Sequence, residues 1–204
     1  MAAELDKSAV AKKISSSLLR VFFYVVLYVV VAAVLQWFFT AYLVGFGIIL
    51  IDYLGYVQVL TAVGLGYLIV NSLATFFYWS MRMKHDHPTS AAVRNIVKII
   101  GVGALVAAIA GGVAGGAAGV ALGGFIGLVV GFASQQVLGQ AIAGLFILIT
   151  RPLKIGDKVV LGGDEGIVED VSTLFTTIVK PDGVKVLIPN NSILGAKIYI
   201  KPSP

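Results

Sequence analysis

The sequence predicts a membrane α-helical fold with four transmembrane helices, the last one kinked, followed by a small all-β barrel or sandwich domain. Of the 204 residues, 12 % are charged and 58 % are apolar, whereas soluble domains average about 25 % charged residues. Residues 21–81 contain a single charged side chain, Asp52, and residues 99–150 contain none. After Pro152 the pattern changes to short runs rich in valine, isoleucine and threonine, separated by turn residues. A chain this poor in charge cannot cover its surface with polar groups, so most of that surface must face lipid or other subunits.

The expected spans follow from the length that an apolar helix needs to cross a bilayer, about 20 residues. Gly45–Gly55 divides the first apolar block, which predicts spans near residues 18–43 and 55–81, and a third span is expected near residues 91–110. Residues 113–150 exceed one span, so we expect a full span over 113–136 and a shorter helical segment at the membrane interface. Pro152 is expected to end this last helix.

Basic residues predict the orientation of the chain. Four spans put the lysines and arginines of residues 7–20 and 82–98 on one side, together with Arg151 and Lys154, and leave Asp52 on the other. The positive-inside rule makes the basic side cytoplasmic. We therefore expect a multi-pass protein of the inner or plasma membrane with both termini in the cytoplasm. Its parts are a cytoplasmic segment 1–17, three transmembrane sensor helices within 18–112, a last transmembrane and interfacial helix within 113–150, and a cytoplasmic β domain over 151–204.

Glycines recur every four residues around the last predicted span. Four-residue spacing keeps a stripe on one face of a helix, and small residues in lipid allow another helix to approach closely. The stripe has two explanations, which are packing against another helix of the same chain and packing of identical helices in a ring. Its length exceeds what one crossing within the chain requires, which favours the ring. The stripe comprises Gly111, Gly115, Gly119, Gly123, Gly127 and Gly131.

A second stripe lies on another face of the same predicted helix. It consists of Ala121, Phe125, Leu128 and Phe132 and is followed by Gln135. If the glycines pack in a ring, this stripe can face the axis, where rings of apolar side chains shed water and block ions. Periodicity alone leaves an equal alternative, in which the stripe faces lipid or the other spans.

The tail after Pro152 predicts five short strands in a small barrel or sandwich. Gly162–Gly166 predicts a tight hairpin connection. Pro181–Gly183 predicts a turn, because proline fixes φ and glycine tolerates positive φ. The expected strands are Lys158–Leu161, Ile167–Val171, Leu174–Lys180, Val184–Ile188 and Ala196–Ile200.

Several short motifs within residues 113–200 share a specific order and spacing. They are Gly127-Leu128, Gly131-Phe132-Ala133, Gln135, Ala143-Gly144, Arg151–Asp157, Gly166–Glu169, Thr176-Thr177, Asp182-Gly183 and Ile188–Asn190. This segment resembles the small-conductance mechanosensitive channel (MscS-like) family. The resemblance implies a homo-oligomer, a heptamer in the relatives, whose last membrane helix lines the pore, kinks, and leads into an Sm-like β domain. It also implies that Leu128 and Phe132 occupy the two gate-ring positions.

The chain departs from the family pattern at three places. Gln136 occupies the position of the usual kink glycine, so the bend is expected at Gln136, Gly139 or Gly144. An extra N-terminal span precedes the usual three. The chain ends at Pro204, and we expect it to lack the α/β cage of the relatives. The charged residues expected at the cytoplasmic mouth of the pore are then Arg151, Lys154 and Asp157.

The expected function is a mechanosensitive ion channel opened by membrane tension, an osmotic safety valve that passes small ions and solutes with weak selectivity. No enzyme is expected, because the chain has no cysteine, no Ser/His/Asp arrangement and no paired carboxylates in its spans. His85-Asp86-His87 has no third ligand cluster, so neither a metal nor a cofactor is expected. The expected partners are membrane lipids, permeating ions and solutes, and further copies of the chain, not nucleic acid. The alternatives are a non-channel oligomeric membrane scaffold and, third, a small uncoupled transporter.

Overall fold

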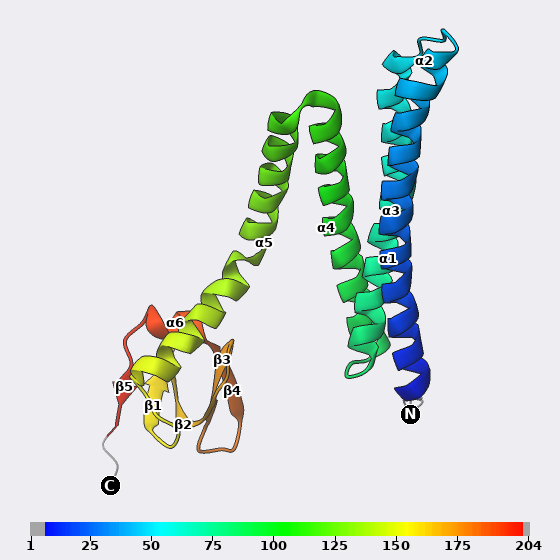
Figure 1. Ribbon diagram of the computed structural model, residues 1–204. Helices are drawn as coiled ribbons and strands as arrows, with labels where there is room; N and C mark the ends of the chain where they lie inside the picture. The colour runs from blue at the N-terminus through cyan, green and yellow to red at the C-terminus, as the bar shows by residue number, and fades with distance from the viewer. Residues whose placement is uncertain (1–6, 202–204) are drawn as a thin grey trace. The chain divides into compact units, whose positions relative to one another are not determined.

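The computed structural model describes residues 7–201, and these fold as two compact units that divide between Gly127 and Leu128. Within the described residues, four helical segments are long and apolar enough to cross a membrane, namely Ser8–Gly45, Ile51–Arg82, His87–Ala114 and Gly116–Thr150. A five-stranded antiparallel sheet follows them along the chain (Figure 1). The predicted fold class, four membrane helices followed by a small β domain, is therefore confirmed.

The first membrane segment is longer than its apolar run. It comprises α1 (Lys7–Trp37), a π-helical turn (Phe38–Tyr42) and α2 (Leu43–Gly45). The helix begins at Lys7, not near residue 18, so the described part of the expected segment 1–17 is helical, while residues 1–6 lie outside the described residues. The bilayer limits the apolar run but not the helix, because exposed lysines can continue a helix into water.

The second and third segments also extend beyond the expected spans. A short 3₁₀ turn (Ile51–Tyr53) leads into α3 (Leu54–Arg82), and α4 covers His87–Ala114. Asp86 caps α4 by accepting a hydrogen bond from the backbone N–H of Thr89 at 3.3 Å, with Pro88 in the first turn. Hydrogen bonds from the side chain and backbone of Thr89 lower the pKa of Asp86, because they favour the charged form.

α1 and α3 lie side by side and antiparallel (Figure 1). Near one end, the side-chain amide of Gln58 donates a hydrogen bond to the amide oxygen of Gln36 at 3.0 Å. Near the other end, the ammonium group of Lys13 lies 4.0 Å from the ring centroid of Trp79. The amide pair satisfies polar groups that lipid cannot hydrogen-bond, which stabilises the helix pair.

α3 and α4 pack through glycines that receive larger side chains. The side chain of Leu105 on α4 lies over Gly66 on α3, and that of Val70 on α3 lies over Gly101 on α4. A Cβ at residue 101 would lie 2.7 Å from Cγ1 of Val70, which is closer than real Cβ contacts occur. Glycine at these positions therefore permits the close approach of the two helices.

The last membrane helix, α5, covers Gly116–Thr150 and does not begin at residue 113 as predicted. Gly115 separates it from α4 with φ of +91°, a conformation that favours glycine. The glycine stripe therefore does not belong to one helix, because Gly111 lies on α4 and Gly119 on α5. α5 is assigned as helix throughout its length, so the bend near Gln136, Gly139 or Gly144 stays a prediction.

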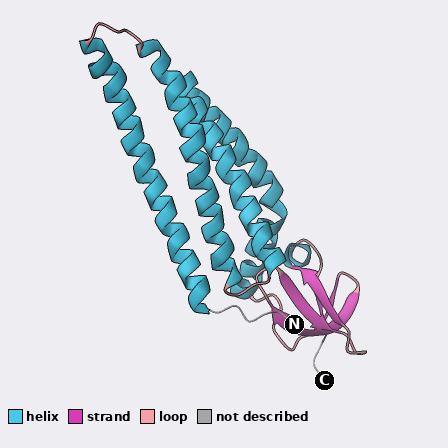
Figure 2. Cartoon of the chain, turned by 90° about the vertical axis from the view of Figure 1, so that its right-hand side faces the viewer, coloured by secondary structure: helices cyan, strands magenta, loops and turns pink. Residues whose placement is uncertain are grey.

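The second unit carries the sheet, drawn in magenta in Figure 2. Its strand order is β4-β3-β2-β1-β5. β1 coincides with the predicted strand, and each of the others overlaps the strand that was expected. The two-residue turn of Gly162 and Gly163, with φ of +61° and +93°, pairs Leu161 with Asp164. The strands are β1 (Lys158–Leu161), β2 (Asp164–Val171), β3 (Phe175–Val179), β4 (Lys185–Pro189) and β5 (Tyr199–Ile200).

The end of the sheet differs from the prediction. A short helix, α6 (Asn190–Leu194), follows β4 and was not predicted. Its last turn continues through hydrogen bonds from Gly195 N to Asn191 O (3.2 Å) and from Ala196 N to Ile193 O (3.3 Å). The chain can therefore pair with β1 only from Tyr199, and β5 is shorter than the expected strand Ala196–Ile200.

The core of the β domain includes the end of α5. Ile147 of that helix is 1 % exposed and packs with apolar side chains of the strands and of α6. The last turns of α5 and the sheet therefore share one hydrophobic core. Its buried members are Ile147, Leu153, Val159, Leu161, Val168, Ile178, Ile188 and Ile193.

Candidate functional site

The candidate gate residues all lie on α5. At 3.6 residues per turn, Ala121, Phe125, Leu128 and Phe132 fall within an arc of about 60° around this helix. The side chains of Phe125, Leu128 and Phe132 are 64 %, 53 % and 68 % exposed in the single chain. Gln135, expected below them, is also exposed. This surface is apolar enough to require cover by lipid or another subunit, or to line a lumen that sheds water. The gate itself stays a prediction.

The glycine stripe divides into two parts. A Cβ at Gly119 would lie 2.7 Å from the Cα of Gly111 and 3.1 Å from the carbonyl oxygen of Ala107, so α4 and α5 nearly touch there. By contrast, no atom lies within 4 Å of a Cβ placed on Gly127 or Gly131. Packing within the chain therefore explains the start of the stripe. The end of the stripe leaves room for a second helix, and its role between subunits stays a prediction.

Gly144 lies where α5 packs against the β domain. Its neighbours Ala143 and Ile147 are 5 % and 1 % exposed. A Cβ at residue 144 would overlap the carbonyl oxygen of Thr173 and the side-chain nitrogen of Asn190. Glycine at this position therefore allows close contact between the helix and the loop before β3. The sequence marked Gly144 as part of a motif and as a kink candidate, but this contact was not predicted.

Asn190 organises that loop. Its side chain is fully buried, accepts a hydrogen bond from Thr176 Oγ1 at 2.8 Å, and donates to the carbonyl oxygens of Ser172 (2.8 Å) and Thr173 (3.0 Å). The amide thus fixes the loop against which Gly144 packs. A buried amide with these partners stabilises one loop conformation, because each group would otherwise be unsatisfied. Asn190 lies in one of the sequence motifs, but no role was predicted for it, since burial of a polar side chain after a proline has no periodic signal.

The connection after α5 contains the three residues expected at the pore mouth. Arg151 has φ of +49° and its N–H bonds to Ile147 O at 2.9 Å, so this residue ends the helix in a left-handed conformation. The carboxylate of Asp157 accepts the backbone N–H of Lys154 at 2.7 Å. Asp157 therefore stabilises the loop before β1. The side chains of Arg151 and Lys154 are exposed, and their position at a pore mouth stays a prediction.

Salt bridges on the β domain join its strands and the residues that flank them. Glu165 pairs with Lys201 (2.6 Å) and Lys158 (3.4 Å), which joins β2, β1 and the end of β5. Hydrogen bonds from Lys201 and then Lys158 lower the pKa of Glu165. Lys180 pairs with Asp164 at 2.6 Å, and that contact raises the pKa of Lys180. These side chains are partly exposed and support the sheet without forming a site.

No group of three potential metal ligands occurs among residues 7–201. A groove of about 730 Å³ opens between α3 and α4, and its lining is mostly apolar, with Asp52 as the carboxylate among its residues. The residues that line this groove do not bring a nucleophile, a base and an oxyanion donor together. The part of the chain with a specific geometry is therefore α5 and its junction with the β domain.

Residues 136–199 match the family model described as the β-domain of mechanosensitive ion channels. This segment is similar to the β-domain of mechanosensitive ion channels. An MscS family protein of Archaeoglobus fulgidus is 44 % identical over 71 residues, which are 35 % of this chain and 25 % of that relative. The large-conductance mechanosensitive channel MscMJLR of Methanocaldococcus jannaschii is 38 % identical over 76 residues, which are 37 % of this chain and 21 % of that channel. The resemblance to the MscS-like family is confirmed.

Solved structures of MscS-like channels share the fold. The cryo-EM structure of Arabidopsis thaliana MSL1 is 19 % identical, with a TM-score of 0.51, and the match covers 74 % of this chain and 59 % of that one. A structure of wild-type AtMSL1 gives a TM-score of 0.52 at 22 % identity, covering 69 % and 54 %. The chain thus spans a quarter or less of the two named relatives and somewhat over half of these structures.

The family match and the structure agree on which residues belong together. The MscS-like β-domain match begins at Gln136, within α5, and not at the first strand. The compact second unit likewise includes the end of α5. The second half of the last membrane-length helix is therefore structurally part of the β-domain unit, and the other membrane-length helices precede it.

Proposed function

We propose that this MscS-like chain forms a homo-oligomeric channel that membrane tension opens, passing small ions and solutes with weak selectivity during osmotic stress. One observation carries the proposal. α5 is a 35-residue helix without a charged side chain, and it continues directly into a mechanosensitive-channel β-domain. A helix that is apolar on every side and exposed in the single chain requires cover, which lipid and neighbouring subunits can provide.

The gate in this proposal is apolar. Rings of Leu128 and Phe132, one of each per subunit, narrow the pore until water leaves it, and ions cannot cross a dry segment. Ala121 and Phe125 line the pore above the gate, and Gln135 lines its hydrated end below. The exposure of Leu128 and Phe132 in the single chain supports this arrangement.

Assembly in this proposal uses the free end of the glycine stripe. Gly127 and Gly131 have open space at their Cβ positions, which suits close approach of α5 from a neighbouring subunit. The resemblance to the MscS-like family favours seven subunits. The basic ends of the helices face the cytoplasm, which places both termini there and the protein in the inner or plasma membrane.

Tension acts on the area of the protein in the membrane. Stretch favours the state with the larger in-plane area, as a ligand favours the state that it binds better. α1, α3 and α4 face lipid and transmit the tension to α5. Exposed Arg151 and Lys154 at the cytoplasmic mouth attract anions. The resulting preference for anions is slight, because salt screens their charge beyond about 8 Å.

Hypo-osmotic shock of cells tests this function. The chain is expressed in bacteria that lack their own tension-gated channels, and membrane insertion is confirmed by fractionation. A tension-gated channel raises survival after sudden dilution above that of cells with an empty vector. A membrane scaffold would insert and assemble without raising survival. An uncoupled transporter would pass solutes before the dilution as well as after it.

A further inference from the structure

The groove between α3 and α4 widens along the two helices. The helices touch where the side chain of Leu105 lies over Gly66. Toward the end of α3 that begins after Asp52 they diverge (Figure 1), and a Cβ added at Gly55 of α3 or at Gly112 of α4 would meet no atom within 4 Å. Both glycines line the groove, whose volume is about 730 Å³. Cavities of roughly 300–1,000 Å³ are the usual size of sites for one small ligand.

The charged side chain in the lining of this groove is a carboxylate. Asp52 lines the groove at its wide end, and all lining residues come from residues 21–81 and 99–150, which contain no lysine or arginine. Within residues 7–201, the salt bridges lie on the β-domain, so no cation of the described chain neutralises Asp52. An unpaired carboxylate beside an apolar wall is complementary to a cation that comes from outside the chain.

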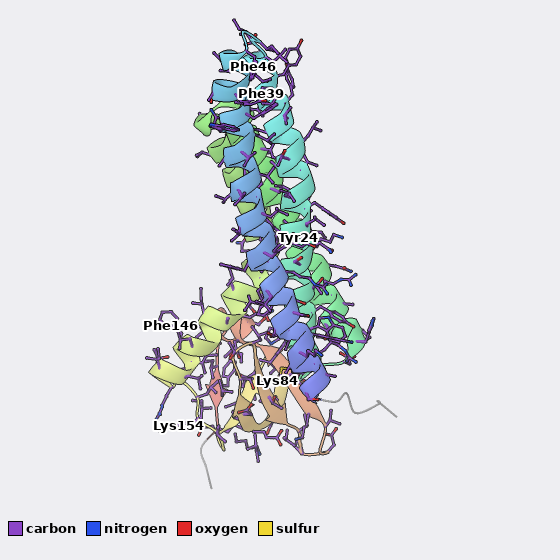
Figure 3. All side chains as sticks on the ribbon, turned by 45° about the vertical axis from the view of Figure 1, so that its right-hand side comes forward. Tyr24, Phe39, Phe46, Lys84, Phe146 and Lys154 are labelled. Atoms are coloured by element: carbon purple, nitrogen blue, oxygen red, sulfur yellow. The ribbon has the colours of Figure 1, made fainter. Side chains whose placement is uncertain are left out.

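Tyr56 adds an aromatic ring beside this carboxylate. It lies four residues after Asp52, so the two side chains share a face, and both line the groove. The Tyr56 side chain is 72 % exposed, which leaves its ring accessible. A ring face attracts alkylated ammonium groups, and a carboxylate supplies the opposite charge. Phe39 and Phe46 lie at this end of the α1–α3 pair, whereas Lys84 lies at the other (Figure 3).

The rest of the groove is suited to a hydrocarbon chain. Its walls include Val59 of α3 and Ala108 and Ile109 of α4. From Asp52 to Gly66, α3 rises about 21 Å at 1.5 Å per residue, which is long enough for an extended chain of about twelve carbon atoms. Removing such a chain from water favours its binding between the helices.

We propose that this groove binds a single-chain amphiphilic amine, with the ammonium group at Asp52 and Tyr56 and the alkyl chain between α3 and α4. A cationic head with one apolar chain matches the charge at the wide end and the apolar walls below it. An anionic amphiphile would place its charge against the Asp52 carboxylate, and like charges repel. The proposal goes beyond the proposed function, because binding in this groove requires neither a pore nor tension.

Binding of tritiated dodecyltrimethylammonium to the purified protein in a neutral maltoside detergent tests the proposal. A scintillation proximity assay should show saturable binding, which the unlabelled compound displaces. Dodecyl sulfate has the same chain with the opposite charge, and tetramethylammonium has the head without the chain. Neither should displace the probe at the same concentration. Equal displacement by dodecyl sulfate would overturn the proposal, because the site would then recognise the chain alone.

A substitution at the carboxylate tests its role. Asp52→Asn should weaken binding about tenfold, because it removes the charge that pairs with the ammonium group. The matched control is Asp86→Asn at the other end of α3, where asparagine also caps α4. This control should bind the probe as the wild type does. An unchanged affinity in Asp52→Asn would contradict the proposed site.

A second substitution fills the groove. Gly112→Leu should abolish binding, because the added side chain enters the groove from a position with open space at its Cβ. Gly64→Leu is the control, since Gly64 also has open space at its Cβ but does not line the groove. The midpoint of thermal unfolding confirms that each variant is folded. Full binding by folded Gly112→Leu would place the ligand elsewhere and overturn the proposal.

Phosphatidylethanolamine distinguishes a single-chain ligand from a membrane lipid, because it joins an ammonium group to two acyl chains. It should not displace the probe at concentrations at which unlabelled dodecyltrimethylammonium does. Displacement at equal concentration would assign the groove to lipid and overturn the proposal. A protein that conducts no current under tension would still bind the amine, so the two proposals fail separately.

Discussion

Gly144 of α5 lies against the main chain of Thr173 so closely that a Cβ at residue 144 would overlap the Thr173 carbonyl oxygen. This contact joins the last membrane helix to the loop before β3. Besides the covalent connection after Thr150, contacts of this kind link the position of α5 to the β-domain. Residues on both sides of the contact, Ile147 and Asn190, are fully buried, so neither side can give way easily.

The change Gly144→Ala should destabilise this junction by about 1–3 kcal/mol, the usual cost of overpacking a tight contact. The midpoint of thermal unfolding of the purified protein in detergent measures the effect. Gly139→Ala is the matched control, because Gly139 lies on the same helix with open space at its Cβ position. The control should be neutral or stabilising by about 0.5–1 kcal/mol, since alanine favours helix. Equal destabilisation by both changes would mean that Gly144 has no special contact.

Asn190→Ala should cost about 1–3 kcal/mol, because it leaves the buried hydroxyl of Thr176 and two loop carbonyls without their partner. Asn191→Ala is the control on the same short helix, where the side chain is exposed. Chemical denaturation of the purified protein, followed by far-UV circular dichroism, compares the two variants. If the two alanine variants are equally stable, the hydrogen bonds of Asn190 do not hold the loop.

Gly127→Leu should weaken assembly while leaving the subunit folded. Space around Gly127 is open within the chain, so the added side chain can clash only with another molecule. Light scattering of the detergent-solubilised protein gives the mass of the complex. Val30→Leu is the control on α1, where Val30 is 51 % exposed. An intact complex in both variants would remove Gly127 from the subunit interface.

Most of the fold could be predicted from the sequence because its signals are local. The absence of charge over residues 99–150 requires lipid, and the glycines after Leu161 predict a hairpin. The connection predicted over Gly162–Gly166 is shorter in the structure, because Asp164–Gly166 belong to β2 and pair with β1. A break between residues 110 and 113 was predicted, and the structure places it at Gly115. Its exact position could not be predicted, because the glycine stripe keeps its spacing across it. The helical start at Lys7 was missed because bilayer thickness limits apolar runs and not helices.

The candidate site could be predicted only where its sequence signal is local. The stripe that contains Leu128 and Phe132 is periodic, and the family resemblance predicts that it lines the pore, which stays a prediction. Asn190 and Gly144 act through contacts with residues distant in sequence, Thr176 and Thr173, and no local pattern encodes such pairs. The resemblance marked both positions within motifs, but it could not reveal that they meet each other.

Phe132→Ser should produce a channel that opens at lower tension and leaks at rest. Hydroxyl groups in the gate would hold water where phenyl rings expel it. Val130→Ser is the control, because Val130 lies about 160° away around the same helix at almost the same depth. Growth of cells that express each variant reports the leak, which should slow growth for Phe132→Ser alone. Normal growth and an unchanged threshold would show that Phe132 is not part of the gate.

Current through membrane patches under suction tests the central claim most directly. Purified wild-type protein is reconstituted in liposomes, and its oligomeric state in the same preparation is confirmed by light scattering. The account predicts stepwise currents that begin above a threshold of suction, cease on release, and carry both cations and anions. Patches that contain the assembled protein and conduct no current at any suction before rupture would contradict the account and favour a membrane scaffold.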